Sequence, residues 1–570
     1  MRKKALLIVL AAVLCAALIS GLFLAPALRR QNASAEQTGT PALPGPTDTY
    51  AFTDPVPQNT PFIRAYREEV QMFAGETVRL DGLFLCGGVE PEYEVSGGCL
   101  IIAGDTVSAA EPGTAKITAR AGEYAAAVTV TVSRAAVEFG SRFISLCTGQ
   151  TAKLEYTVKP AGSVVVLRTD GEAAEISGST VTGVRQGVVR TEAYINGERA
   201  GYCFVIVSDR AHYEPLRSIE TPRFYASGNA LTNGKTGDSA VIMLTGDIMC
   251  LSAQQNAAKA GQSFDFAPSF ELVRDYFSGA DFVMGNLETA LAPSHPYTFE
   301  AKNIDSRPNC NAPAVLLDAL RYAGYDAVAA ANNHALDAGE QGIYETLERL
   351  EKYRIAVTGI YAGEEPRYIL ADINGIRVAF LSYTEIMNRR SAVSAQRYEE
   401  IIGGYSAENA KRDCAAARAD GAEFIIAYMH WGRENTHEVT DRQKRQAQEL
   451  ADAGVDMIAG SHPHCLQGAQ YIAARDGRQV LCVYSMGNFV SSMGRDINND
   501  TVIVRLELIR GESGVTLAGA GYLPCRVRAY NGKRFVITPC GLQDDSGLEA
   551  ARTRISGVIG EALSELSFSR

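Results

Sequence analysis

Six apolar segments in the second half of the chain are each followed by residues whose side chains can bind a metal or transfer a proton. The segments read VIMLTGD, DFVMGNLE, DAVAAANNH, FIIAYMHWGRE, VDMIAGSHPH and LCVYSMGNF. The polar residues at their ends are Asp247, Asn286, Glu288, Asn333, His334, His430, His462, His464, Ser485 and Asn488. Four of the seven histidines of the chain are among them, so the chemistry of this protein is expected here.

The residue types indicate which chemistry that is. Three histidines, two carboxylates and an asparagine amide form a mixed nitrogen and oxygen set, which suits Mn²⁺, Fe²⁺ or Zn²⁺ better than the all-oxygen shell of Mg²⁺. The set is large enough for two ions, and a two-metal centre polarises a phosphoryl or carbonyl oxygen and supplies hydroxide near neutral pH. His334 follows the candidate ligand Asn333 and is the natural proton donor to a leaving group. The pattern predicts metal-assisted hydrolysis.

Alternating strands and helices must position these residues. From about Ser239 onward, short apolar runs alternate with helical patterns, which is typical of an α/β domain. Each polar residue comes at the carboxyl end of its apolar run. Because ligands bind at the carboxyl ends of strands in open α/β sheets, we expect these separate segments to converge on one site.

Length and composition limit the remaining possibilities. A chain of 570 residues is expected to form three or four domains. Hydrophobic residues make up 46% and charged residues 21%, which excludes disorder of the whole chain. The 65 acidic residues outnumber the 54 basic ones, so a broad basic surface for nucleic acid is not expected.

The N-terminus carries an uncharged apolar run from Ala5 to Leu28, with basic residues at both ends. As a helix it would be about 36 Å long, enough to cross a hydrocarbon core of about 30 Å, which predicts a transmembrane helix within residues 1–30. A cleaved signal peptide stays open, because Ala33–Ala35 offers a small-residue site. The short basic N-terminal side predicts a single-pass cell-membrane protein whose bulk is extracytoplasmic. Residues 31–61 are rich in Pro, Thr and Ser and are expected to form a linker.

A repeat with an offset of about 74 residues precedes the α/β region. The tripeptide at 106–108 matches the one at 180–182, and both copies end in alternating β-branched runs that suit half-buried strands. The phrase GTAKITA at 113–119 resembles bacterial Ig-like domains of exported proteins. We predict two such β-sandwich domains, at 62–135 and 136–210, that act as spacer or adhesion modules.

Several smaller expectations concern the regions around the main domain. An exported location permits disulfides, and Cys86–Cys99 and Cys147–Cys203 are the first pairs to expect, with buried free thiols as the alternative. A linker is expected at 211–238. The main domain should span 239–535, followed by a C-terminal extension at 536–570. Within that extension, 548–566 predicts an amphipathic helix, although two glycines weaken this prediction.

Six motifs of the α/β region resemble the CapA (PgsA) family of poly-γ-glutamate capsule biosynthesis proteins. They read GDIM at 246–249, NLE at 286–288, NNHALDxG at 332–339, HWGxE at 430–434, GSHPHxxQ at 460–467 and SMGNF at 485–489. That family is related to the calcineurin-like metallophosphoesterases. The resemblance implies a calcineurin-like four-layer α/β/β/α sandwich, preceded here by two all-β Ig-like sandwich domains and an N-terminal transmembrane helix.

The resemblance also implies roles for individual residues. The metal ligands carried over are Asp247, Asn333, His430, His462 and His464, and the catalytic acid is His334. Two positions depart from the phosphoesterase pattern, because Met249 replaces a histidine ligand and Asn286 replaces a bridging aspartate. Glu288 is expected to compensate as a ligand. A thioether and a neutral amide are weaker ligands for hard cations, so a centre with one ion instead of two stays open.

Other residues are expected to orient the ligands or contact substrate: Asn286, Asn332, Asp337, Trp431, Glu434, Gln467, Ser485 and Asn488. Asp337 fits a cap of the following helix equally well, and Trp431 fits simple packing. Glu434 is a candidate for orienting His430. The remaining histidines and the nearby cysteine are expected to face solvent or to pack: His212, His295, His437 and Cys465.

Two functions stay open from the sequence. The first is a membrane-anchored, extracytoplasmic, metal-dependent hydrolase that acts on a phosphoester or an amide of a cell-surface polymer during capsule or envelope biosynthesis. The second is a non-catalytic component of a capsule synthesis or export complex that binds a polymer such as poly-γ-glutamate. The partners expected are the envelope polymer and the membrane proteins of capsule synthesis. The retained histidines favour the enzyme.

Overall fold

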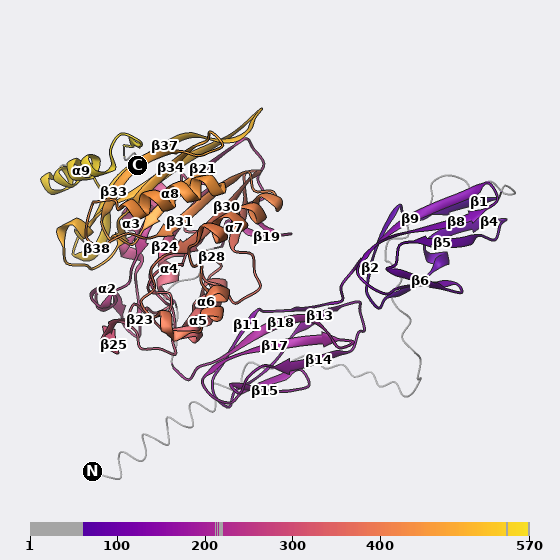
Figure 1. The fold of residues 1–570 in the computed structure, drawn as a ribbon. Helices are drawn as coiled ribbons and strands as arrows, with labels where there is room; N and C mark the ends of the chain where they lie inside the picture. The colour runs from indigo at the N-terminus through magenta and orange to yellow at the C-terminus, as the bar shows by residue number, and fades with distance from the viewer. Residues whose placement is uncertain (1–60, 211–212, 214, 216–220, 543–544, 568–570) are drawn as a thin grey trace, which may run out of the picture. The chain divides into compact units, whose positions relative to one another are not determined.

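The computed structural model describes residues 61–210, 213, 215, 221–542 and 545–567 (Figure 1). The apolar segment from Ala5 to Leu28, nearly all of the expected linker at 31–61, and His212 lie outside the described residues. Within the described ranges, no helix combines the length and the apolar character that a membrane crossing requires.

The first β-rich region contains nine strands and one short 3₁₀ helix. They are β1 (Phe62–Ala65), β2 (Glu69–Phe73), β3 (Thr77–Arg79), η1 (Leu80–Gly82), β4 (Phe84–Gly87), β5 (Glu92–Ser96), β6 (Leu100–Ala103), β7 (Thr106–Ala109), β8 (Gly113–Ala121) and β9 (Tyr124–Ser133). Two sheets have the strand orders β2-β9-β8-β5 and β3-β7-β6. Alternate residues of β9, Val128, Val130 and Val132, are buried, which is the period of two expected of a half-buried strand.

The second β-rich region repeats this arrangement. Its strands are β10 (Ala136–Phe139), β11 (Phe143–Leu146), β12 (Thr151–Lys153), β13 (Tyr156–Lys159), β14 (Val165–Thr169), β15 (Ala174–Ser177), β16 (Thr180–Gly183), β17 (Gly187–Ile195) and β18 (Glu198–Val207). The sheets β11-β18-β17-β14 and β12-β16-β15 have the same order as those of the first region. In both copies, an early strand pairs in parallel with the last one. The sequence repeat is therefore a repeat of strand order.

The disulfides expected in these regions are wrong. Cys99, Cys147 and Cys203 are free thiols. Cys203 is completely buried in β18, where burial raises the pKa of its thiol to about 12, whereas Cys147 is exposed. The alternative of a buried thiol describes Cys99 and Cys203.

Two large sheets form the α/β domain. The eight-stranded sheet contains, in spatial order, β19 (Tyr225–Ser227), β20 (Ala230–Thr232), β29 (Tyr368–Ile373), β30 (Ile376–Thr384), β31 (Phe424–His430), β32 (Met457–Ser461), β34 (Gln479–Met486) and β33 (Leu466–Ala473). The nine-stranded sheet contains β28 (Ala356–Thr358), β27 (Ala327–Ala329), β24 (Phe282–Leu287), β21 (Ser239–Ile248), β36 (Asp500–Gly511), β37 (Gly514–Tyr530) and β38 (Lys533–Pro539), with β35 (Asn488–Val490) on β21 and β39 (Ser564–Glu565) on β37.

Helices and short hairpins complete the domain. The helices are α2 (Ser252–Ala258), α3 (Glu271–Phe277), α4 (Leu316–Ala323), α5 (Gly339–Lys352), α6 (Ala395–Ile401), α7 (Ala407–Ala419), α8 (Asp441–Ala453) and α9 (Ser546–Ile559). The shorter elements are β22 (Lys259–Ala260), β23 (Ser263–Phe264), η2 (Ala267–Ser269), β25 (Asn303–Ile304), β26 (Arg307–Pro308), η3 (Arg390–Ala392) and η4 (Asp496–Asn498).

The apolar strands sort their side chains onto two faces, and this produces four layers. Ile242 and Leu244 of β21 join the core between the two sheets, where the rings of Phe282 and Phe380 stack with centroids 4.6 Å apart. Met243, between them in sequence, faces α3 and α4 instead. On the other sheet, buried residues of β31 pack against α7 and α8. The order helix, sheet, sheet, helix is the four-layer sandwich expected from the sequence.

Both ends of the predicted main domain extend further than the sequence indicated. β20, which lies in the expected linker 211–238, pairs with β29 of the large sheet. At the other end, β38 crosses the predicted boundary between 535 and 536. Helix α9 buries Leu548 and Ile555 in the core between the sheets, and it ends before Gly560, whose φ of 79° is left-handed. It is shorter than the predicted helix at 548–566.

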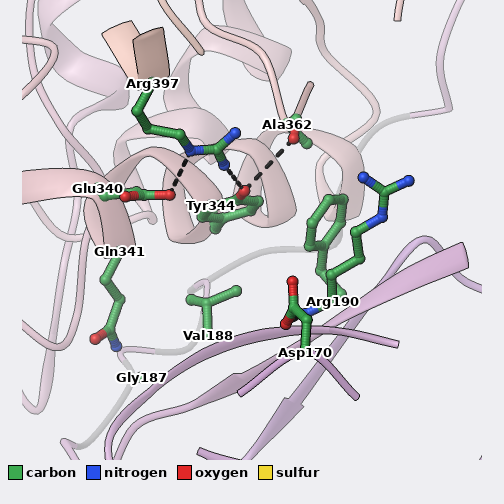
Figure 2. Close-up of a pocket in the computed structure, with 10 residues that line it drawn as sticks. Asp170, Gly187, Val188, Arg190, Glu340, Gln341, Tyr344, Ala362 and Arg397 are labelled. Atoms are coloured by element: carbon green, nitrogen blue, oxygen red, sulfur yellow. Dashed lines mark hydrogen bonds and ion pairs between the residues drawn. The ribbon is translucent and has the colours of Figure 1, made fainter. Parts of the chain in front are cut away.

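The second β-rich region contacts the α/β domain within one compact unit that comprises 63–85 and 91–570. The ring of Phe204 lies 4.7 Å from that of Tyr344 on α5, and Arg142 pairs with Glu365 at 2.9 Å. Beside this contact is a cavity of about 430 Å³ (Figure 2). Its lining includes Arg397, whose guanidinium is already paired with carboxylates of the same domain.

The core between the sheets yields a stability prediction. Phe380→Ala removes a fully buried ring and should lower the free energy of unfolding by about 3–5 kcal/mol, because the cavity cannot collapse between two rigid sheets. Urea unfolding followed by the fluorescence of Trp431, the single tryptophan, reports on this domain. Tyr471→Ala, at a 47% exposed position of β33, should change it by less than about 0.5 kcal/mol. Equal effects of the two substitutions would contradict the proposed core.

Candidate metal centre

Parallel strand pairs bring the predicted ligands to neighbouring strand ends. β21 and β24 are parallel, with Asp247 opposite Asn286. β31 and β32 are parallel as well, with His430 opposite Ser461. Because the two sheets pack face to face, the carboxyl ends of all four strands meet at one edge of the sandwich.

Two glycines allow the backbone to pass closely at this edge. A Cβ atom on Gly246 would lie 1.9 Å from the carbonyl oxygen of Gly487, and one on Gly460 would lie 2.0 Å from that of Tyr484. Any side chain at these positions would push the strand ends apart. Gly246, one residue before Asp247, and Gly460, two residues before His462, therefore permit the site to form.

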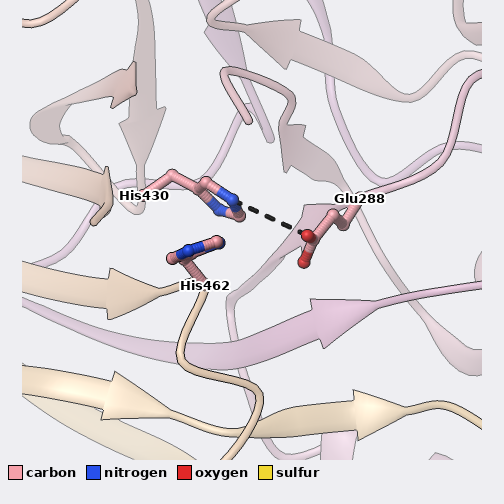
Figure 3. Close-up of side chains that lie close together, drawn as sticks. All are labelled: Glu288, His430 and His462. Atoms are coloured by element: carbon pink, nitrogen blue, oxygen red, sulfur yellow. Dashed lines mark ion pairs between the residues drawn. The ribbon is translucent and has the colours of Figure 1, made fainter. Parts of the chain in front are cut away.

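Glu288 lies at the centre of the cluster, and Figure 3 shows it beside His430 and His462. Its Oε1 atom is 3.6 Å from Nε2 of His430 and 3.8 Å from Nε2 of His464. Potential ligand atoms of Asp247, Glu288 and His464 lie within 4.8 Å of one another, and so do those of Glu288, His430 and His462. Glu288 is thus common to two groups of ligands.

Unpaired polar atoms show that the cluster fits a metal. Both carboxylate oxygens of Glu288 and Nδ1 of His462 are buried and make no hydrogen bond. A buried polar atom without a partner is costly, and a buried carboxylate even more so. A divalent cation would satisfy these atoms at once, and carboxylate oxygen with imidazole nitrogen is a donor set that Mn²⁺, Fe²⁺ and Zn²⁺ accept.

Burial governs the charge of these groups. Burial and the nearby Asp247 carboxylate raise the pKa of Glu288 well above its usual value. Burial lowers the pKa of His462 to about 3 and that of His430 well below its usual value, so both are neutral, as a metal ligand must be. Burial also lowers the pKa of His464, but its contact with Asp247 outweighs this and the net shift is upward.

The structure explains the two departures from the phosphoesterase pattern. Nδ2 of Asn286 donates to Oδ1 of Asp247 at 2.8 Å, so the asparagine orients the Asp247 side chain, while Glu288 supplies the central carboxylate of the cluster. Met249 is buried, and its sulfur accepts a hydrogen bond from Ser491 at 3.8 Å. Glu288 thus offers a carboxylate two residues after Asn286, and the thioether of Met249 packs against Ser491.

Asn333 and His430 face each other across the cluster. Oδ1 of Asn333 lies 3.1 Å from Nε2 of His430, and the other ring nitrogen of His430 lies 3.1 Å from Oγ of Ser461. Asn332 donates to the carbonyl oxygen of Leu287 at 2.8 Å and so fixes the turn before Asn333. A ligand histidine held through its second nitrogen is a common feature of metal sites.

His464 is held by two asparagines and by its own turn. Its Nδ1 lies 3.0 Å from Oδ1 of Asn488, and Asn498 donates to its carbonyl oxygen at 2.8 Å. Ser485 donates to the next carbonyl oxygen, that of Cys465, at 2.8 Å. His462 and His464 have φ angles of 93° and 56°, a left-handed conformation that is unusual outside glycine. The surrounding hydrogen bonds stabilise a turn that presents both imidazoles to the same side.

His334 is paired with a carboxylate. Its Nδ1 lies 2.7 Å from Oδ2 of Asp337, and the same oxygen accepts a hydrogen bond from the backbone of Cys310 at 2.7 Å. The alternative of a helix cap is wrong, because α5 follows Ala338 and has no side-chain hydrogen bond at its N-cap. Asp337 orients His334 instead.

Three further candidates lie at the edge of the cluster or outside it. Trp431 is fully buried in the helix-facing core and donates to the carbonyl oxygen of Tyr484, so it packs. Gln467 donates to backbone carbonyls of the loop before α8. Glu434 is exposed, and its carboxylate lies near His462 and His464 rather than near His430.

The other histidines and Cys465 differ in burial. His437 is exposed and donates to the carbonyl oxygen of Leu466 at 2.7 Å. His295 is not solvent-facing as expected, because it is half-buried and its Nε2 is buried without a hydrogen bond. Cys465 is buried, and burial raises the pKa of its thiol to about 11.

The residues that the sequence did not reveal act through backbone atoms or from distant segments. Ser461 could have been found, since it ends a strand directly before His462. Cys310 uses only its backbone N–H, which leaves no signal in the side-chain pattern. Asn498 is the last residue of η4 and Arg389 follows β30, both outside the six motifs, and Arg389 reaches Asp337 at 3.7 Å.

The fold and site together define an α/β domain with a buried cluster of the kind that holds metal ions. Residues 241–493 match the family described as bacterial capsule synthesis protein PGA_cap. This match contains all six motifs and confirms the resemblance to the CapA family.

Curated relatives and solved structures were also found. The chain is 28% identical over 254 residues to the PGA biosynthesis protein CapA of Bacillus subtilis (strain 168), with 43% of this chain and 62% of the relative covered. It is 27% identical over 250 residues to the capsule biosynthesis protein CapA of Bacillus anthracis, with 42% and 57% covered. The chain thus spans roughly three-fifths of the length of these relatives. A calcineurin-like phosphoesterase, YfkN from Bacillus subtilis, is similar in structure with a TM-score of 0.34 and 14% identity, over 56% of this chain and 97% of that one.

The lowered histidine pKa values predict how stability depends on pH. In the folded protein, after a chelator has removed any metal, His430 and His462 stay neutral. In the unfolded chain they take up protons below about pH 6.5. The unfolded state binds more protons, so stability should fall as the pH drops below 6.5, by about 1.4 kcal/mol per pH unit for each histidine. Urea unfolding of the metal-free protein at several pH values between 7.5 and 5 measures how the free energy of unfolding changes with pH.

A variant isolates the contribution of one histidine. Glu288 has the opposite effect on stability. Because its pKa is raised in the folded protein, its contribution to the free energy of unfolding declines as the pH rises above about 4.5. Comparing wild type with His462→Asn cancels that term. The slope of the variant should be smaller by about 1.4 kcal/mol per pH unit; an unchanged slope would show that His462 is not buried as a neutral group.

Proposed function

We propose that this chain is a membrane-anchored, extracytoplasmic protein with a calcineurin-like, metal-dependent hydrolase site that acts in the biosynthesis or processing of a capsule or envelope polymer related to poly-γ-glutamate. The relatives named as capsule and PGA biosynthesis proteins support the process. The bond cleaved is a phosphoester or an amide, since metal-assisted hydrolysis serves both.

The buried carboxylate of Glu288 carries the proposal. It is completely buried among His430, His462 and His464, and neither oxygen has a hydrogen bond. A packed apolar core offers no reason to keep a carboxylate in this state, and a protein that only needed stability would be better served by a hydrophobic residue. The cost is explained if the carboxylate holds a cation.

Two sets of residues would hold the metal. Asp247, Glu288 and His464 form one set, and Glu288, His430 and His462 with Asn333 form the other. A bound divalent cation polarises a phosphoryl or carbonyl oxygen and supplies hydroxide near neutral pH. Glu288 belongs to both sets, so the cluster would have donors for two ions.

His334 is the proposed proton donor to the leaving group. Asp337 accepts a hydrogen bond from its Nδ1, which leaves Nε2 for the reaction. The backbone N–H of Cys310 holds the same carboxylate oxygen. Asp337 therefore keeps His334 in one orientation and one tautomer, as in other histidine and carboxylate pairs.

The remaining parts of the chain fit an extracytoplasmic location. The apolar segment from Ala5 to Leu28 is proposed to anchor the chain, and the two β modules, proposed to be bacterial Ig-like, to act as spacers. The expected partners are the polymer and the membrane proteins that synthesise it.

Metal content is the first test. Wild-type protein loaded with Mn²⁺, Fe²⁺ or Zn²⁺ and freed of excess should retain a stoichiometric amount by elemental analysis. The double variant His462→Ala plus His464→Ala should lose it, because each proposed set loses an imidazole. His437→Ala, an exposed histidine outside both sets, is the matched control and should bind as wild type does. Wild type without stoichiometric metal would refute the proposed centre.

Turnover tests the proton donor. His334→Ala should keep its metal and lose about 10²–10⁴-fold in kcat, the usual contribution of general acid catalysis. Suitable substrates are aryl phosphoesters and γ-glutamyl anilides with poor leaving groups, because these require protonation. The kcat for an aryl phosphoester with a good leaving group should be much less affected by the substitution. Unchanged turnover on both would exclude His334 as the acid, and metal binding without any turnover in wild type would favour a polymer-binding assembly component.

A further inference from the structure

An arginine outside the six motifs lies beside the proposed proton donor. Arg389 belongs to the segment 385–390 that follows β30, and β30 is the neighbour of β31, with Thr384 opposite His430. The backbone of Asn388 donates to the carbonyl oxygen of Asn333 at 3.1 Å. This segment is therefore attached to the turn that carries Asn333 and His334.

The hairpin of β25 and β26 holds the side chain of Arg389 in place. Its Nη2 atom donates to the carbonyl oxygen of Ile304 in β25 at 2.8 Å, and its side chain is 11% exposed. Arg307 of the same hairpin donates to the carbonyl oxygen of Asn388 at 3.4 Å. The hairpin of β25 and β26 thus fixes both the backbone and the guanidinium.

The guanidinium forms a long ion pair with Asp337 but no hydrogen bond to it. Nε of Arg389 and Oδ1 of Asp337 are 3.7 Å apart, and both atoms are buried without a hydrogen bond. An arginine that served only to neutralise Asp337 would be expected to form the short, bidentate pair that guanidinium and carboxylate favour. Here Nε of Arg389 lies beside the Asp337 carboxylate, and its N–H makes no hydrogen bond.

His295 interacts electrostatically with the same two groups. Nε2 of His295 is buried and has no hydrogen bond. Burial lowers the pKa of His295, and the charge of Arg389 lowers it further while that of Asp337 raises it, so both groups are within electrostatic reach. Asp337, Arg389 and His295, from three separate segments, thus each have a buried polar atom without a hydrogen bond and influence one another electrostatically.

Several acidic side chains surround the centre. Asp247, Glu288, Asp337 and Glu434 are all acidic. In the ion pairs of the described ranges, Arg389 is the one Lys or Arg that reaches the His334–Asp337 pair. A fixed positive group beside Asp337 therefore lowers the repulsion between this carboxylate and a negatively charged substrate.

We propose that Arg389 binds an oxyanion of the substrate, a phosphate or a carboxylate, next to His334. The inference rests on the proposed hydrolase function and narrows its substrate to an anionic one. Guanidinium is suited to this role because its planar N–H groups match both oxyanions. A phosphoester would present its phosphoryl oxygens, and a γ-glutamyl chain would present its α-carboxylates.

Calorimetric titration of the full chain loaded with Mn²⁺ tests the proposal and separates the two sources. The probes are inorganic phosphate and γ-glutamylglutamate, and the variants are Arg389→Gln and Arg390→Gln. Arg389→Gln should weaken binding of one probe by about 10- to 100-fold, the range for a charge-assisted hydrogen bond, with unchanged metal content. Arg390, whose guanidinium lies 4.0 Å from the ring centroid of Tyr398, is the matched control and should leave both affinities unchanged.

The probe that Arg389→Gln weakens identifies the anion. If thermal unfolding shows that this variant is unstable, Arg389→Lys is used instead. It preserves the positive charge beside Asp337 but not the planar N–H donors of the guanidinium, and it should still weaken binding of the probe. Binding of both probes as in wild type by a folded, metal-loaded variant would overturn the proposal, and so would a metal-loaded wild type that binds neither.

Failure of the proposed hydrolase function can be distinguished from failure of the anion site. A wild type without stoichiometric metal would refute the metal centre, and titration of the metal-free protein would then test Arg389 by itself. In that arm, phosphate or γ-glutamylglutamate should bind more weakly to Arg389→Gln than to wild type, and equal binding would overturn the anion site.

Discussion

The burial of the Glu288 carboxylate among three imidazoles is the constraint on which the rest of the site depends. Its two oxygens have no hydrogen bond, and the nearby Asp247 adds a like charge. Such a group destabilises the folded chain unless a cation joins it. The neighbouring groups are arranged accordingly, because two of the imidazoles stay neutral and the third pairs with Asp247. The surrounding fold has to supply the stability that this cluster lacks.

The two packed sheets supply that stability and also set the geometry. Continuous apolar strands such as β21 and β31 bury both faces, one against the other sheet and one against helices. Because the strands are rigid and parallel where they meet the site, their last residues are placed accurately. Gly246 and Gly460 then allow a closer approach of the backbone than any side chain would permit. The left-handed turn at His462 and His464 is the strained element that this framework supports.

The contact with the second β module also concerns the site. Leu336, between His334 and Asp337 in sequence, is fully buried in a cluster that includes Phe143 and Phe204 of that module. The turn with the proposed proton donor is therefore backed by side chains from outside the α/β domain. A module that seemed from its sequence to be a spacer also helps to immobilise this turn.

The sequence by itself determined the alternation of strands and helices along the chain, the repeat of the β modules and which residues come at strand ends, because hydrophobic periodicity is a local property. His430, His462 and Glu288 could be chosen on this basis. Only the tertiary structure decided that Glu288 is shared by two ligand groups while Asn286 donates to Asp247, that Asp337 orients His334 instead of capping α5, and that Arg389 lies beside them. These facts depend on distances between segments far apart in the chain. Such distances are set by how the sheets pack, and no local pattern of residues records them.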